Sequence, residues 1–148
     1  MGLNEANLAR IERLTARLAA RHGAATSDEA RAAFEADFVR QRDAVLVPLL
    51  QDLGVALARA GHAFEIELDA GERRPGATFR VLLSGGARGN RNEILFYVQH
   101  ADASEVIVHL ALRNEFELVR YQSIAAMTHA ALEQMLVDGL EHLLVCNG

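Results

Sequence analysis

The stretch SEVIVHLALRNEFELVRY, residues 104–121, decides the fold class of this chain. In its first half apolar side chains recur at every second position, a period that is typical of a β-strand lying on a core. Arg113 and Asn114 interrupt this pattern as a tight turn, and a second, weaker alternating segment follows at once. Because parallel neighbours need long crossover connections, so short a turn predicts an antiparallel hairpin.

Three further segments with the same period precede this hairpin and are joined by short connections: HAFEIELD, ATFRVLLS and NEILFYVQ. The sequence therefore predicts a five-stranded antiparallel meander over residues 63–121. The first strand has one polar face, but the middle strands carry apolar groups on both faces, including Leu95, Tyr97 and Ile107. A sheet that is apolar on both faces needs a further layer or a partner on the second face.

Helical periodicity predicts an N-terminal helical hairpin over residues 1–62. Its first helix covers residues 4–22, carries Leu8 and Ile11 on its apolar stripe and ends at Gly23 in a C-cap position. Arginines fill many of the remaining positions of this helix, so it is strongly amphipathic. A short linker then leads into the second helix.

The second helix is expected to run from Asp28 to Ala60, with Pro48 near its middle. Because the apolar stripe keeps its phase across Pro48, one kinked helix is favoured over two separate ones. At ~1.5 Å per residue this helix approaches ~50 Å, whereas a seven-residue strand covers only ~23 Å. The helix should therefore overhang the sheet, and the first helix, a second subunit or both must cover Phe34 and Phe38.

A last helix closes the predicted fold, with Thr128 as a natural N-cap. Its apolar stripe should pack on the sheet and comprises Leu132, Met135, Leu136, Leu140, Leu143 and Leu144. No repeat and no linker divides the chain, so residues 1–148 are expected to form a single α+β domain. Its parts are residues 1–62 as the helical hairpin, residues 63–121 as the sheet and residues 122–148 as the C-terminal helix.

The composition is that of an ordinary globular protein, with 148 residues of which 51% are hydrophobic and 24% are charged. A net charge of −5 argues against a protein that coats nucleic acid or anionic membranes. All basic residues are arginine, which together with abundant alanine is typical of a GC-rich bacterial genome. Cys146 is the single cysteine, and no apolar run approaches the ~20 residues of a membrane span. We therefore expect a cytoplasmic protein of bacterial type without membrane contact.

The stretch LLSGGARGNRNEIL, residues 82–95, has the composition of an anion-binding loop. A phosphate-binding loop carries a lysine and is followed by a helix, whereas this stretch has no lysine and lies between two predicted strands. A hairpin connection is therefore favoured. Anion or nucleic-acid binding through the arginine loop 84–92 stays an alternative, with contacts expected from Arg88, Arg91 and Arg113. Nucleic acid is disfavoured because aromatic side chains for base stacking are scarce.

The six histidines and the single cysteine show no catalytic or metal-binding spacing. Histidine and carboxylate pairs at a separation of four, such as His129 with Glu133, stabilise a solvated helix face more often than they bind a metal. We therefore expect no catalytic, cofactor-binding or metal-binding residue and no cofactor, and the chain leans toward a non-enzymatic role.

The favoured function is a non-enzymatic, homodimeric protein that binds or regulates another protein. The overhanging helix and the second apolar face of the sheet supply the predicted interface, which comprises Leu8, Ile11, Phe34, Phe38, Leu95, Tyr97 and Ile107. The first alternative is a small-ligand-binding or enzymatic domain with a pocket between sheet and helices near Arg80, Tyr97 and His109. The second alternative is the anion or nucleic-acid site in the arginine loop.

Overall fold

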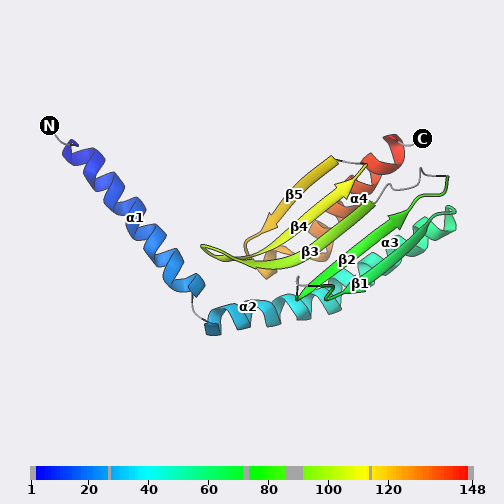
Figure 1. The fold of residues 1–148 in the computed structure, drawn as a ribbon, viewed down its shortest axis with the longest axis horizontal. Helices are drawn as coiled ribbons and strands as arrows, with labels where there is room; N and C mark the ends of the chain where they lie inside the picture. The colour runs from blue at the N-terminus through cyan, green and yellow to red at the C-terminus, as the bar shows by residue number, and fades with distance from the viewer. Residues whose placement is uncertain (1–2, 27, 72–73, 86–91, 114, 147–148) are drawn as a thin grey trace.

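The alternating segments form one antiparallel sheet in the order β1-β2-β3-β4-β5, as predicted (Figure 1). The computed structural model describes residues 3–26, 28–71, 74–85, 92–113 and 115–146. The strands are β1 (Ala63–Leu68), β2 (Gly76–Leu82), β3 (Asn92–His100), β4 (Ser104–Leu112) and β5 (Glu115–Tyr121). The helices are α1 (Glu5–Thr26), α2 (Asp28–Gln41), α3 (Val47–Arg59) and α4 (His129–Cys146), with a π-helical segment η1 (Arg42–Leu46) and a 3-10 turn η2 (Ile124–Ala126). The predicted α+β class is confirmed.

The core lies between one face of the sheet and the helices α3 and α4. On this helix-facing side of the sheet, Phe79 pairs across the strands with Ile94, and Phe96 pairs with Val108. These side chains are buried in one cluster with Leu50 of α3 and with the stripe of α4. Strands alternate their side chains between two faces, so every second residue lies on the opposite face, which we call the open face. The helices α3 and α4 both lie behind the sheet in Figure 1.

The helices α2 and α3 form one continuous helical run through η1, as the unbroken apolar stripe predicted. The predicted distortion at Pro48 takes the form of a π-helical turn just before it. Proline has no backbone N–H to donate to the preceding turn, and its ring clashes with the carbonyl four residues back. The chain widens there, and the N–H of Val47 donates to the carbonyl of Arg42, five residues earlier.

The cover over the outer part of α2 comes from the chain's own strands, which corrects the prediction that α1 or a second subunit supplies it. Phe38 is 0% exposed and belongs to the core, and Phe34 packs against that core. The strands β3 and β4 are nine residues long, so their hairpin reaches beneath α2. There the ring of His100 lies 2.9 Å from the carboxylate of Glu35. The side-chain amide of Gln41 also donates to the carbonyl of Met127, beside η2.

The helix α1 extends away from α2 and from the sheet instead of packing along them (Figure 1). Asn4 caps its start, since the Asn4 side-chain oxygen accepts the Asn7 N–H at 2.8 Å. The helix continues to Thr26, so the predicted C-cap at Gly23 is wrong. A single glycine costs only about 1 kcal/mol within a helix, and the two alanines that follow it are the best helix formers.

The helix α4 begins as predicted and packs through most of the predicted stripe, but Leu144, which was assigned to the stripe, is 37% exposed at the end of the helix. The N–H of Ala131 donates to the Thr128 hydroxyl at 3.2 Å, which confirms the N-cap. Four leucines of the stripe are buried against the sheet: Leu132, Leu136, Leu140 and Leu143. Within the ranges that the structure describes, the helices are all too short or too polar to cross a membrane.

Candidate binding surfaces

The first candidate surface is the α1 stripe, which we define as Leu8, Ile11 and Leu14 of α1 together with Leu3, which lies just before the helix begins at Glu5. All four side chains are exposed; Leu8 is 47% and Ile11 is 45% exposed. At 3.6 residues per turn the three helical members share one side of α1, with Arg10, Arg13 and Arg17 along one border of that side and glutamates along the other. The α1 stripe is therefore an unburied amphipathic surface with an arginine flank.

The second candidate surface lies on the open face of the sheet. We define the open-face patch as Leu95, Tyr97, Phe116 and Leu118. Leu95 and Tyr97 are half-buried, whereas Phe116 is 73% and Leu118 is 53% exposed. Ile107, which the sequence places in the same interface, lies between its cross-strand neighbours Tyr97 and Arg120 and is only 2% exposed. Ile107 and Phe38 are therefore buried within the chain itself and do not belong to an exposed interface.

The charged groups of the open face are paired with one another. The guanidinium of Arg80 lies 2.8 Å from Glu67, 3.1 Å from Glu93 and 3.7 Å from Glu65. These hydrogen bonds, first to Glu67 and then to Glu93, raise the pKa of Arg80. At the other side of the face, Arg120 lies 2.8 Å from Glu105. Each of these four glutamates thus lies within 4 Å of an arginine, although two arginines against four carboxylates leave this set of charges at −2.

The pocket predicted near Arg80, Tyr97 and His109 is only a small hollow. A cavity of about 110 Å³ lies beside Arg80 and Tyr97, with Thr78 in its wall. His109 does not line it but stacks on Phe116, with ring centroids 5.5 Å apart. Sites for small ligands usually measure about 300–1,000 Å³, so this hollow is too small for one.

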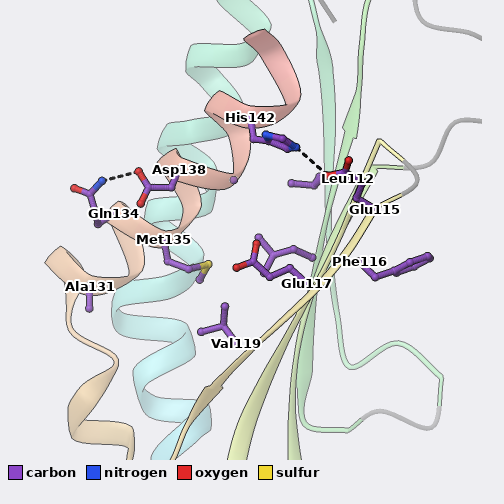
Figure 2. A pocket seen from close by; sticks show the side chains of 12 residues that line it. Leu112, Glu115, Phe116, Glu117, Val119, Ala131, Gln134, Met135, Asp138 and His142 are labelled. Carbon is purple, nitrogen blue, oxygen red and sulfur yellow. Dashed lines mark hydrogen bonds and ion pairs between the residues drawn. The ribbon is translucent and has the colours of Figure 1, made fainter. Parts of the chain in front are cut away.

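The third candidate surface is a groove of about 740 Å³ between β5 and α4 (Figure 2). The helix α4 packs on β4 and η1, and the inward side of β5 is left exposed at Glu115 and Glu117, whereas Val119 and Tyr121 further along the strand pack against the core. The lining of this β5–α4 groove includes Leu110, Leu112, Glu117, Val119, Met135 and Asp138. In Figure 2, Glu117, Val119 and Met135 point into the space between α4 and the sheet, whereas Phe116 points to the opposite side of the sheet. The groove thus has an apolar floor with carboxylates above it.

The carboxylates of the groove differ in their partners. The His142 ring lies 2.9 Å from Glu115, and the side-chain amide of Gln134 donates to Asp138 at 2.7 Å. Glu117 is exposed and makes no hydrogen bond or ion pair to another residue that the structure describes. Glu117 lies opposite Leu110 in the register and so faces the helices. The groove therefore holds a negative charge that nothing in the described chain neutralises.

Sequence reasoning missed this groove, although β5 carries a signal of it. In EFELVRY the two glutamates lie on the same face of the strand as Val119 and Tyr121, which face the core. A strand that places glutamates on its core-facing side is not fully covered there. Burial of Tyr121, at the covered end of β5, raises the pKa of its phenol.

Sequence reasoning also missed a buried arginine. The side chain of Arg42 is 7% exposed, and its guanidinium lies 2.9 Å from Asp43, 2.9 Å from Asp69 and 3.2 Å from the carbonyl of Gly76. Burial alone would lower the pKa of Arg42, but hydrogen bonds and charges from Asp43 and Asp69 outweigh burial and raise it. Asp69 adopts φ 56° at the end of β1 and also accepts the N–H of Gly76. Arg42 thus ties the β1–β2 connection to η1, which is a structural role.

The predicted anion site lies mostly outside the described residues, which exclude Arg88 and Arg91. Arg113 is exposed, and its backbone N–H donates to the Asn92 side chain at 2.9 Å. Arg113 is therefore beside the C-terminal end of the arginine loop, as the meander predicted. Within the described ranges, histidine, cysteine, aspartate and glutamate form no group of three that could hold a metal ion.

Comparisons with known proteins do not place the chain in a family. No family model matches it, and neither a curated protein nor a solved structure matches it.

Proposed function

We propose that the protein is a cytoplasmic, non-enzymatic homodimer that binds or regulates another protein. The α1 stripe is the observation that carries this proposal. Most of the stability of a helix in a protein comes from burying its amphipathic face, and an isolated helix is only marginally stable in water. A 22-residue helix that exposes three aliphatic side chains on one side, with a fourth just before it, is therefore best explained by a partner that covers it.

The open-face patch supports a second contact, made to a different protein. Tyrosine and phenylalanine are enriched at protein interfaces, and polar groups commonly form the rim around such a centre. Here Tyr97 and Phe116 lie among the paired charges of Arg80 and Arg120. We assign self-association to α1 and partner binding to the open face.

The native mass tests the homodimer. Wild-type protein should sediment as a dimer at micromolar concentration, and Leu8→Glu with Ile11→Glu should raise the dimer Kd by at least about 100-fold, because it places unpaired charges in an apolar contact. The matched control is Val55→Glu on α3, which is 45% exposed like Ile11 and should leave the dimer unchanged. A monomeric wild-type protein would exclude self-association.

Partner binding is tested separately with Phe116→Ser and Leu118→Ser. A protein that the wild type captures from a native lysate should be lost by this double variant, which should keep its native mass. Capture that the substitutions do not affect would exclude the open-face patch as the partner site. This experiment does not test the homodimer, because the variant leaves α1 unchanged.

The volume of the β5–α4 groove favours a second candidate function, binding of a small ligand. Its size falls within the range of about 300–1,000 Å³ of ligand sites, and an apolar floor under carboxylates suits a hydrophobic amine. Thermal unfolding in the presence of a series of alkylamines tests this candidate. A ligand of the groove should raise the Tm of the wild type but not that of Glu117→Gln.

A further inference from the structure

We infer that the β5–α4 groove is the seat of α1 from a second copy of this chain. The inference rests on the proposed homodimer and names the contact that would build it. The same α1 stripe then meets an apolar floor made by Leu110, Val119 and Met135. Each copy would both donate its α1 and receive the partner's, which gives the self-complementary interface of a two-fold dimer.

The two surfaces match in length. From its first residue, Glu5, to Leu14 the helix α1 advances nine residue steps, which is ~14 Å at ~1.5 Å per residue. On the groove side, α4 contributes lining residues from Ala131 to His142, which is eleven residue steps and ~17 Å. About three turns of α1 therefore fit along the groove.

The two surfaces are also opposite in charge. The helix α1 carries four arginines and two glutamates, a net charge of +2. The lining of the groove carries three carboxylates, Glu115, Glu117 and Asp138, and no arginine, a net charge of −3 with His142 neutral. Glu117 in particular is unpaired within the described residues and points into the groove. The arginine flank of α1 supplies the missing cations.

The open face is the weaker seat for α1, because each of its glutamates already lies within 4 Å of Arg80 or Arg120, whereas Glu117 of the groove has no such neighbour among the described residues. Addition of a strand at the sheet edge is disfavoured by the charges on the edge strands β1 and β5. The chain's own α1 extends outward beyond the end of α2 and away from the sheet in Figure 1. The groove of a partner is thus the place where both the apolar stripe and the arginine flank are satisfied.

Charge reversal in two separate variants tests the contact. The helix variant carries Arg10→Glu, Arg13→Glu and Arg17→Glu, and the groove variant carries Glu117→Arg and Asp138→Arg. Each variant alone should have a dimer Kd at least about 100-fold above the wild type, because like charges then meet in both grooves. In an equimolar mixture one groove pairs the reversed charges and the other pairs the native ones, so a heterodimer should form with a Kd within about tenfold of the wild type.

Controls separate this contact from changes in net charge or folding. Asp52→Arg with Glu133→Arg makes the same change in net charge as the groove variant at exposed positions outside the groove, and it should dimerise like the wild type. All substituted side chains are exposed, and far-UV circular dichroism checks that each variant is folded.

The outcomes distinguish the inference from the proposed function. A dimeric wild type whose variants stay dimeric, or stay monomeric on mixing, would overturn the α1–groove contact and leave the homodimer standing. A monomeric wild type would overturn both. If that monomer also sedimented with vesicles of phosphatidylcholine and phosphatidylserine, α1 would be assigned to a membrane surface instead.

Discussion

Replacement of Gly54 by alanine should destabilise the fold, although alanine is the better helix former. The helix α3 packs on β1 through Gly54, whose buried backbone lies against the ring of Phe64. A Cβ atom at this position would lie 2.6 Å from the Phe64 Cγ and closer still to two other ring carbons. The ring cannot move aside easily, because it packs on Phe79 with centroids 6.1 Å apart.

The magnitude follows from two opposing effects. The helix propensity of alanine over glycine contributes about 1 kcal/mol of stability. Overpacking of a tight core costs about 1–3 kcal/mol, and the contact with a ring carbon near the backbone places Gly54→Ala at the upper end. We therefore expect a net loss of about 2 kcal/mol in the free energy of unfolding.

Gly139 of α4 is the matched control. A Cβ there would lie 3.0 Å from the Leu110 Cδ2 and 3.5 Å from the Leu112 Cδ1, which are flexible ends of side chains. Gly139→Ala should therefore keep most of its gain of about 1 kcal/mol. Urea unfolding, with all variants at one protein concentration, measures both changes. Phe64→Leu should partly restore stability in the Gly54→Ala background, and a Gly54→Ala protein as stable as wild type without this coupling would refute the reasoning.

Three further predictions concern charge and pH. Arg42→Met should lower the free energy of unfolding by about 1–3 kcal/mol because it removes charged hydrogen bonds, whereas exposed Arg40→Met should change it by less than about 0.5 kcal/mol; urea unfolding measures both. Burial raises the pKa of Tyr121, so the stability that its neutral phenol contributes is complete below the unfolded pKa of about 10 and is lost as pH rises through the folded value. In Tyr121→Phe the free energy of unfolding, measured by urea unfolding at a series of alkaline pH values, should therefore fall less with pH than in the wild type. Added salt should raise the wild-type dimer Kd but lower that of the Arg10→Glu, Arg13→Glu, Arg17→Glu variant, because screening weakens attraction and repulsion alike; sedimentation in a salt series checks both signs.

The sheet could be predicted from sequence because its determinants are local. A period of two sets which side chains share a face, and the short connections restrict neighbouring strands to antiparallel pairing. The α4 helix was equally predictable, since Thr128 and the leucine stripe are both local signals. The end of α1 was less predictable, because Gly23 alone signals a helix end while several strong helix formers surround it.

The cover over Phe38 could not be predicted because it depends on distances between elements far apart in the chain. A seven-residue strand is too short to reach Phe38 on the long helix, so the sequence predicted that Phe38 lies beyond the sheet. The actual strands β3 and β4 are longer, and their hairpin meets α2 at Glu35 and His100. The groove was missed for a related reason: the glutamates of β5 can be assigned to a face from the sequence, but whether α4 reaches over that face cannot.

The net charge of −5 does not describe how charge is distributed over the molecule. That sum hides a basic α1 and an acidic pair of elements, β5 and α4, which lie far apart in one copy. Within a single chain these opposite charges cannot neutralise each other, since exposed charges separated by more than about 10 Å are largely screened. Two copies brought together through α1 and the groove would place each arginine flank against a carboxylate rim. The separation of charge along the molecule therefore supports the proposed association between copies, in which the apolar stripe beside the arginines would be the side of α1 that makes the contact.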